Sequence, residues 1–338
     1  MRIGRWAAGL AAAVLVAGGV SACGGGGATE QTGASGEGFP VRIRSALGTA
    51  TVEKAPKRVV TIGWGSQDVA LALGVVPVGI QDFTADSGTG NGVLPWDRPK
   101  LGNAKPTLIK ATTSEVPYEK IAALRPDVIL AANSGITAAQ YGKLKQLAPT
   151  VAYPGKPWET SLADQTRLVG KALGKPKQAE ALLKRERARI AAVAREHPEF
   201  KGKTVAFGSG TEPGSMNFYY DQDSRVQLLT DLGFTPAPSV SKLGSGGSQN
   251  AFAKTVSLES LPDIDSDVLV SWYLAPSVRR SLEGNALFRK MPAVRNGAYV
   301  PLTDPALVYA TSAPSVLSVP WMLDRYAPEL SKAAKKAG

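Results

Sequence analysis

The chain carries very few of the side chains that usually perform catalysis or bind transition metals. Its 338 residues include one histidine, His197, and one cysteine, Cys23. A transition-metal site of the usual kind needs several nitrogen or sulfur ligands, and a serine–histidine–aspartate triad would have to use His197. That histidine precedes a proline at an expected helix end, and the chain has no Gly-x-Ser-x-Gly motif. The sequence therefore favours a binding protein over an enzyme and predicts no direct metal site.

Two glycine-containing stretches match nucleotide-binding motifs only in part. Gly202-Lys203-Thr204 has the end of a phosphate loop, but His197 stands where the first glycine of that loop belongs. Gly208 and Gly210 follow an expected strand, but Pro213 takes the place of the third glycine of a dinucleotide motif. We therefore expect no nucleotide cofactor.

Cys23 ends a segment that is typical of export and lipid attachment. A positively charged start precedes the uncharged apolar stretch 6–20, which is too short to cross a bilayer as a helix. Val20-Ser21-Ala22-Cys23 resembles the lipobox of bacterial lipoproteins. The resemblance implies a signal peptide at 1–22, acyl chains such as palmitate on Cys23, and a flexible lipidated tether at 23–38. It places the mature protein on the extracytoplasmic face of the cell membrane, on the periplasmic or cell-wall side.

The chain is basic, with 39 lysines and arginines against 28 acidic residues and a formal net charge of +11. Such a charge suits nucleic acid, anionic lipid or an anionic ligand. Nucleic acid is not expected outside the membrane, and we find no nucleic-acid-binding motif. A solvated basic surface beside anionic lipid is the simplest interpretation.

Apolar strand patterns alternate with helical patterns along most of the chain, after an expected hairpin at 39–53. This alternation predicts parallel β/α layers. Strands are expected at 58–63, 77–80, 127–132, 204–208, 267–272 and 298–302, and helices at 67–73, 118–124, 138–147, 224–232 and 313–326.

A long amphipathic helix divides the pattern into two halves. It begins at Pro176, ends near His197, and is about 30 Å long at 1.5 Å per residue. We therefore expect an α/β protein with two Rossmann-like lobes joined by one long rigid helix. The predicted boundaries are 39–172 for the N-terminal lobe, 173–199 for the interlobe helix and 200–338 for the C-terminal lobe.

Four segments resemble a known family. They are Pro56–Val60, Leu73–Gly79 (LGVVPVG), Tyr118–Ile129 (YEKIAALRPDVI) and Ala293–Val300 (AVRNGAYV). Together with the lipobox, they are similar to the substrate-binding lipoproteins of ABC importers, within the group for iron siderophores (Fe³⁺-hydroxamate) and vitamin B12. The resemblance implies the class III periplasmic-binding-protein fold and a non-enzymatic monomer. Such a protein delivers a ferric siderophore to a permease dimer with its ATPase, and iron enters only as a chelate.

The resemblance also implies two acidic docking residues, one in each lobe. In this family a surface glutamate of each lobe pairs with arginines of the permease. These glutamates correspond to Glu119 and Glu259, with Glu115 as the alternative in the first lobe. Exposed ion pairs add little stability, so a role in steering and docking suits both positions.

Aromatic residues follow several of the expected strands. Ligands of α/β proteins lie beyond the carboxyl ends of strands, and a chelate needs an apolar surface with a few polar anchors. We therefore expect a hydroxamate siderophore in an interlobe cleft, with Trp96 as a possible lid and Arg279 or Arg280 as the anchor of chelate oxygens. The other expected ligand-binding residues are Trp64, Trp158, Tyr219, Tyr220, Trp272 and Tyr273.

Several alternatives remain open at this point. Haem could be ligated by Tyr219 or Tyr220, bare Fe³⁺ by both together, and cobalamin could replace the siderophore. A partner-binding role at the envelope is also compatible with the sequence. The siderophore class is open too, because Lys110 stands where some hydroxamate binders have an arginine.

Overall fold

The computed structural model describes residues 38–243 and 252–337. The expected signal peptide, Cys23 and nearly all of the expected tether lie outside these residues. No helix in the described part is long and apolar enough to cross a membrane.

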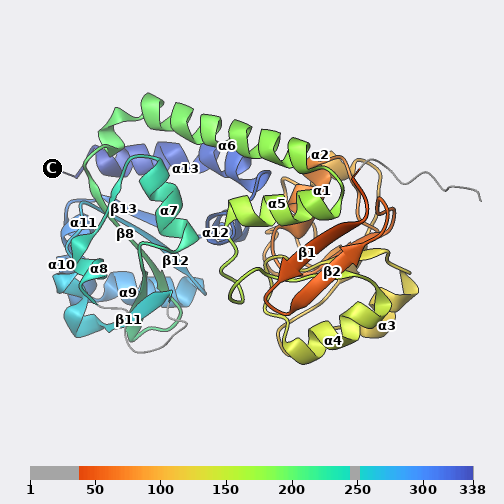
Figure 1. The fold of residues 1–338 in the computed structure, drawn as a ribbon. Coiled ribbons are helices and arrows are strands. Elements are labelled where there is room, and N and C mark those ends of the chain that lie inside the picture. Colours follow the sequence, from red (N-terminus) through yellow and green to blue (C-terminus); the bar gives the residue numbers. More distant parts are fainter. Residues whose placement is uncertain (1–37, 244–251, 338) are drawn as a thin grey trace, which may run out of the picture. The chain divides into compact units, whose positions relative to one another are not determined.

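The first lobe contains the β1–β2 hairpin, coloured red to orange in Figure 1, and a parallel five-stranded sheet of order β5-β4-β3-β6-β7. Hydrophobic residues fill all three positions of β6 and two of the three in β3, as expected for strands buried on both faces. The strands are β1 (Val41–Ser45), β2 (Gly48–Val52), β3 (Val59–Thr61), β4 (Gly79–Gln81), β5 (Thr107–Ile109), β6 (Val128–Leu130) and β7 (Thr150–Val151). The helices are α1 (Ser66–Ala72), α2 (Arg98–Leu101), α3 (Tyr118–Ala123), α4 (Ala138–Leu147) and α5 (Leu162–Ala172).

The second lobe contains a mixed sheet of order β11-β9-β8-β12-β13, with β10 also paired to β8. Strands β8, β10, β12 and β13 are parallel, and β9 pairs antiparallel with both β8 and β11. The strands are β8 (Thr204–Gly210), β9 (Ser215–Tyr219), β10 (Thr235–Pro236), β11 (Ala253–Ser257), β12 (Val268–Tyr273) and β13 (Tyr299–Leu302). The helices are α7 (Ser224–Asp231), α8 (Pro238–Ser241), α9 (Pro276–Gly284), α10 (Ala286–Lys290), α11 (Pro292–Arg295), α12 (Pro305–Ser312) and α13 (Ser318–Ala334), with 3-10 helices η1 (Pro198–Phe200) and η2 (Leu258–Asp263).

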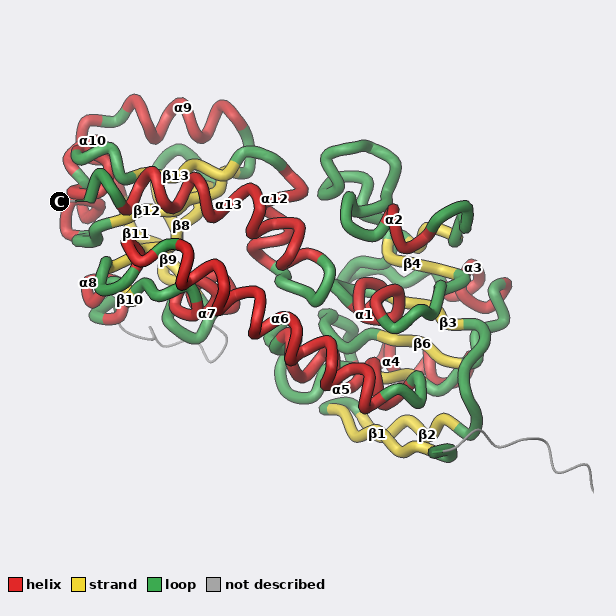
Figure 2. The backbone as a smooth tube through the Cα atoms, turned by 90° about the horizontal axis from the view of Figure 1, so that it is seen from above, coloured by secondary structure: helices red, strands yellow, loops and turns green. Residues whose placement is uncertain are grey.

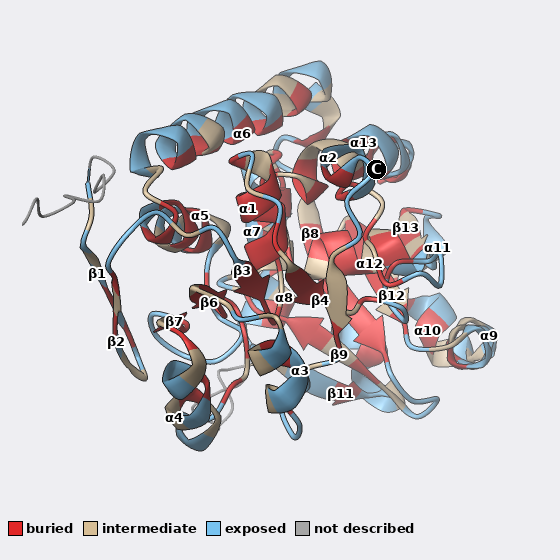
Figure 3. Ribbon diagram, turned by 90° about the vertical axis from the view of Figure 1, so that its right-hand side faces the viewer, coloured by how far each residue is buried: buried red, intermediate tan, exposed pale blue. Residues whose placement is uncertain are grey.

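The predicted linking helix is present as α6 (Pro176–Glu196), which runs from one lobe to the other in Figure 2. Leu183 packs into the first-lobe core, while Ile190 and Val193 pack into the second-lobe core. The Arg189 guanidinium lies 2.5 Å from the Asp324 carboxylate and ties α6 to α13. Figure 3 shows the buried strands of both sheets and the exposed outer turns of α6. The expected α/β architecture, with two lobes and one linking helix, is confirmed.

Two parts of the sequence prediction differ from the structure. The sequence predicts no strand between residues 208 and 224, but residues Ser215–Tyr219 form β9, which pairs with both β8 and β11. The last helix, expected at 313–326, instead runs from Ser318 to Ala334 as α13, and a helix that was not expected, α12 (Pro305–Ser312), precedes it. The chain breaks between them at Pro314 and Ser315, where the Ser315 hydroxyl accepts the backbone N–H groups of Leu317 and Ser318.

Candidate functional site

The candidate site lies where the strand order reverses in each sheet. In the first lobe, β4 and β5 follow on one side of β3, and β6 and β7 follow on the other side. The point of reversal, called the switch point, therefore falls between β3 and β6. In the second lobe the corresponding point falls between β8 and β12. Ligands of open α/β sheets bind beyond the carboxyl ends of such strands.

Trp64 lies at the first switch point, immediately after β3. Gly63 has φ +79°, and a Cβ there would lie 2.4 Å from the Asn133 carbonyl oxygen, so a side chain at that position is excluded. The Trp64 backbone N–H donates to the same Asn133 oxygen at 2.8 Å. The close approach of these two strand ends therefore fixes Trp64 at the carboxyl edge of the sheet.

Trp158 completes this part of the site and has a strained backbone. Its φ is +63°, which is rare for a bulky residue, and its side chain is 36% exposed. The indole crosses Gly135 and lies 4.8 Å from the Trp64 ring, measured between centroids. An exposed aromatic ring on strained backbone is typical of a residue held for ligand contact.

Tyr309 on α12 brings the second lobe against these tryptophans. Its ring centroid lies 5.7 Å from Trp64, 4.9 Å from Phe83 and 6.0 Å from Trp96. The Tyr309 hydroxyl has no hydrogen-bond partner among the described residues. Sequence analysis missed Tyr309 because it did not predict α12.

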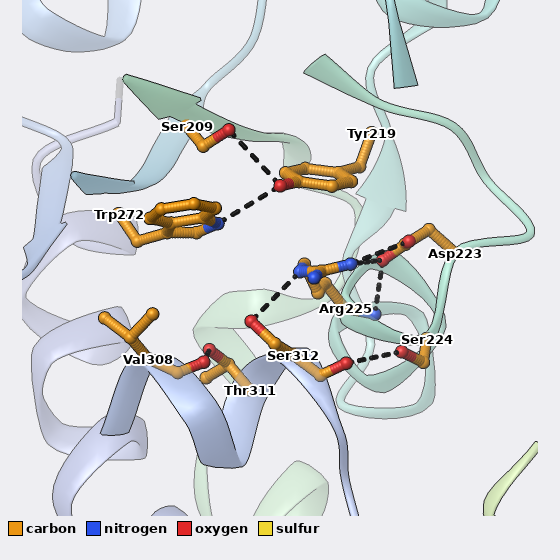
Figure 4. Close-up of polar contacts among 9 residues, drawn as sticks. All are labelled: Ser209, Tyr219, Asp223, Ser224, Arg225, Trp272, Val308, Thr311 and Ser312. Carbon is orange, nitrogen blue, oxygen red and sulfur yellow. Dashed lines mark hydrogen bonds and ion pairs between the residues drawn. The ribbon is translucent and has the colours of Figure 1, made fainter. Parts of the chain in front are cut away.

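Tyr219 and Trp272 form the second-lobe part of the site. Figure 4 shows the Tyr219 hydroxyl between Ser209 and Trp272. The Trp272 indole N–H donates to that hydroxyl at 3.2 Å, and the same hydroxyl donates to Ser209 Oγ at 3.2 Å. Phe252, which is 53% exposed, stacks on the Tyr219 ring at 6.1 Å. These contacts hold Tyr219 and Trp272 in one aromatic surface.

Arg225, from α7, is the cationic residue of this surface. Its guanidinium lies 4.2 Å from the Tyr219 ring centroid, in a cation–π contact. Nη1 donates to both Asp223 carboxylate oxygens, at 2.8 and 3.0 Å, and Nε donates to Ser312 Oγ at 3.3 Å (Figure 4). Nη2 makes no hydrogen bond to a described residue. Arg225 was not among the ligand-binding residues expected from the sequence. Its place in the first turn of α7, soon after Tyr219 in the chain, is the sequence feature that could have indicated it.

The remaining predicted ligand residues lie on the opposite face of the second-lobe sheet. Neighbouring residues of a strand point to opposite faces, so Tyr219 and Trp272 cannot share a face with Tyr220 and Tyr273. Tyr220 and Tyr273 are buried in the core on the other face. The Tyr273 hydroxyl lies 2.5 Å from that of Tyr299, whose hydroxyl donates to Glu283 Oε1 at 3.1 Å.

The predicted arginine anchor belongs to that second group. Arg279 Nε lies 2.7 Å from Glu283 Oε1, one turn along α9, and Arg280 is exposed. Trp96 is also in a different setting from the expected lid. It is 5% exposed, and its indole N–H donates to Asp68 Oδ2 at 2.7 Å.

Glu119 and Glu259 are exposed in the first turns of α3 and η2. Each stands two residues before a fully buried apolar residue, Ile121 or Leu261, so the two segments are anchored in the same way. His197 Nδ1 lies 3.1 Å from Glu199 Oε1, and its ring stacks on Phe200, which is a structural role. Within the described residues, no group of three or more histidine, cysteine, aspartate and glutamate side chains could hold a metal ion.

Two α/β lobes, one linking helix and an aromatic site shared by both lobes define a solute-binding protein rather than an enzyme. The periplasmic binding protein family matches residues 59–306, and the chain belongs to this family.

Relatives with known names support the same class. The Fe(3+) dicitrate-binding periplasmic protein FecB of Escherichia coli K12 is 28% identical over 261 residues, covering 76% of this chain and 80% of FecB. The probable siderophore-binding lipoprotein YfiY of Bacillus subtilis 168 is 26% identical over 296 residues, covering 83% and 85%. The crystal structure of Streptococcus pneumoniae TIGR4 PiaA with ferrichrome is similar, with a TM-score of 0.77 and 34% identity over 88% of this chain and 99% of PiaA.

Proposed function

We propose that this protein binds a ferric siderophore of the hydroxamate type at the aromatic site and delivers it to an ABC permease for iron uptake. The observation that carries the proposal is two aromatic pairs, Trp64–Trp158 in the first lobe and Tyr219–Trp272 in the second, which α12 links through Tyr309 and Ser312, with Arg225 beside Tyr219. An apolar surface with one polar anchor suits a bulky chelate whose donor oxygens remain partly accessible.

The charge of the site favours a neutral chelate. Arg225 is paired with Asp223, so the two charges cancel, and the other described residues of the site are uncharged. Three hydroxamate groups, each with one negative charge, neutralise Fe³⁺, whereas citrate and catecholate complexes are anionic and need unpaired cations. Arg225 Nη2 is available to donate to a hydroxamate oxygen. The ferrichrome bound by the similar PiaA is a chelate of this neutral class.

The same geometry disfavours two of the alternatives. Tyr219 and Tyr220 lie on opposite faces of β9, so they do not form a pair of ligands for bare Fe³⁺. The Tyr219 hydroxyl is bonded to Trp272 and Ser209 under an arginine, which is a poor environment for an axial haem ligand. Cobalamin has no feature of the site in its favour beyond the family resemblance.

The delivery step rests on Glu119 and Glu259. Both are exposed and lie on different lobes, so one permease dimer could pair with both through arginines. We further propose that Cys23 carries the lipid that holds the protein at the extracytoplasmic face of the membrane, and that the protein works as a monomer.

Tryptophan fluorescence of the purified protein tests the ligand. The titration uses ferrichrome, ferrioxamine, ferric citrate, a ferric catecholate, haem and cobalamin, with each iron-free siderophore as a control. We expect saturable quenching by a ferric hydroxamate, with a Kd below about 1 µM, and none by the iron-free form. Tyr219→Phe should weaken binding, while the matched variant Tyr220→Phe, on the other sheet face, should not. A response to haem or cobalamin alone would refute the siderophore proposal.

A further inference from the structure

A single buried carboxylate joins the two lobes next to the aromatic site. Asp68, in α1, is 0% exposed, and its Oδ2 accepts a hydrogen bond from the Trp96 indole N–H at 2.7 Å. The same oxygen accepts the hydroxyl of Ser315, which lies in the second lobe between α12 and α13. Trp96 in turn packs against Tyr309 and against Trp321 of α13. Asp68 therefore contacts the residues that support the floor of the site from both lobes.

A second buried carboxyl, that of Asp97, lies beside Asp68. Asp97 is 0% exposed, and neither of its oxygens has a hydrogen-bond partner among the described residues. Asp68 Oδ1 is also buried and unpartnered. No described lysine, arginine or histidine forms an ion pair with either aspartate. Two buried carboxylates without a cation cannot both be ionised, so at least one of them holds a proton.

The surroundings of Asp68 and Asp97 indicate which of the two carboxyls holds the proton. Burial raises the pKa of Asp68 to about 7, against the opposing effect of the hydrogen bonds from Ser315 and Trp96. Burial and the charge of Asp68 raise the pKa of Asp97 well above its usual value, against the opposing effect of the Gln67 side chain. The other titratable group beside the pair is Tyr309, on which Asp86 also acts. The charged residues of α2 and α5, the other helices of the first lobe that pack on α1, are exposed: Arg98, Lys100, Asp164, Arg167 and Lys171.

We propose that Asp68 is a positioning residue of the ligand site, which holds Trp96 and Ser315 together across the two lobes with a strength set by whether Asp68 or the neighbouring Asp97 is ionised. An ionised carboxylate accepts both hydrogen bonds more strongly than a protonated one, because charge-assisted bonds are about twice as strong as neutral ones. Ionisation of Asp68 therefore tightens the Trp96–Tyr309 contact. Its effect on ligand affinity rests on the proposed function, but its effect on Trp96 does not.

The indole N–H signal of Trp96 in ¹H–¹⁵N NMR spectra tests the proposal without ligand. Trp96→Phe assigns the signal by its disappearance. Between pH 5 and 9 the signal should titrate in the wild-type protein with a midpoint near 7, and Asp97→Asn should lower that midpoint by about one pH unit or more. Asp86→Asn removes a nearby exposed acid and serves as the matched control, with an unchanged midpoint. A wild-type signal that is independent of pH, or an unchanged midpoint in Asp97→Asn, would overturn the proposal.

Two further measurements separate the remaining explanations. If sodium or calcium chloride abolishes the titration of the Trp96 indole signal at constant ionic strength, Asp68 and Asp97 bind a cation. In that case the proposal is wrong. Ser315→Ala should weaken binding of the ferric chelate about tenfold and keep the indole titration. Unchanged affinity in Ser315→Ala would remove the positioning role. If no chelate binds the wild-type protein, the proposed function fails. The indole titration still tests whether the charge of Asp97 controls the ionisation of Asp68.

Discussion

Glu186 of the linking helix makes the stability of this protein depend on pH. It lies one turn after Leu183 and one turn before Ile190, so it belongs to the buried stripe of α6 where the helix passes from one lobe core to the other. Its side chain is 5% exposed, and Oε1 has no hydrogen-bond partner among the described residues. Burial raises its pKa from 4.5 to about 8, and the opposing effect of Arg189 is smaller.

The direction of the effect follows from the protons bound in each state. Below about pH 4 the carboxyl is protonated in both states and contributes no pH dependence. Between pH 4.5 and 8 the unfolded chain loses its proton while the folded chain retains it, so the free energy of unfolding falls as pH rises. At about 1.4 kcal/mol per pKa unit, the full shift corresponds to an upper bound of about 5 kcal/mol. Relaxation and water entry reduce this value, so we expect about 2 to 3 kcal/mol.

Glu186→Gln removes the charge and keeps the shape of the side chain. Urea unfolding of the variant and the wild type at pH 5, 6, 7 and 8 should give a difference that grows with pH in favour of the variant. Glu196→Gln, an exposed position near the end of the same helix, is the control and should show no such growth. A difference that is constant with pH, or a variant that is less stable at pH 8, would refute the assigned burial of an acidic group at this position.

Three other predictions concern the ligand site and its delivery function. Trp158→Gly should relieve backbone strain of about 1 to 3 kcal/mol, so the free energy of unfolding should hold or rise while chelate affinity falls at least about tenfold; a loss of both would contradict the strain argument. Arg225→Gln should weaken ferric hydroxamate binding by about 10- to 100-fold in the fluorescence titration, and unchanged binding would exclude Nη2 as the anchor. The double variant Glu119→Gln, Glu259→Gln should bind the chelate with wild-type affinity but support less iron uptake in cells; normal uptake would remove both residues from the docking surface.

The sequence was sufficient for the architecture because that architecture depends on patterns the side chains impose locally. Apolar runs such as Val59–Val60 and Val128–Leu130 predicted parallel strands buried on both faces, and the strands that contain them, β3 and β6, are neighbours in the middle of the first sheet. The stripe on α6 predicted a helix that packs on two cores. Strand β9 was missed because its mixed composition gives a weak pattern, and its edge-strand partner β11 follows it only after a long gap.

The ligand residues were harder to predict, because the presence of an aromatic residue in the sequence does not tell on which face of the sheet its side chain lies. Both members of the adjacent pairs Tyr219-Tyr220 and Trp272-Tyr273 were expected in the site. Strand alternation places only one member of each pair on the side of the site. Trp272 already ended an expected strand; had Tyr219 also been assigned to a strand, the alternation alone would have separated these two residues from Tyr220 and Tyr273. The Asp68–Ser315 contact joins residues 247 positions apart, and no local pattern indicates it.

Helix α12 explains why the two halves of the site depend on each other. Tyr309 and Ser312 are three residues apart and therefore lie near each other on one face of the helix. Tyr309 contacts Trp64 of the first lobe, while Ser312 accepts a hydrogen bond from Arg225 of the second. The helix starts where Asp304 Oδ1 accepts the Leu307 N–H and Pro305 occupies the first position. Asp-Pro before an apolar run is a strong helix-start signal, so the sequence contained enough information to predict α12. Because α12 contacts Trp64 through Tyr309 and Arg225 through Ser312, a shift of this helix would change both contacts together.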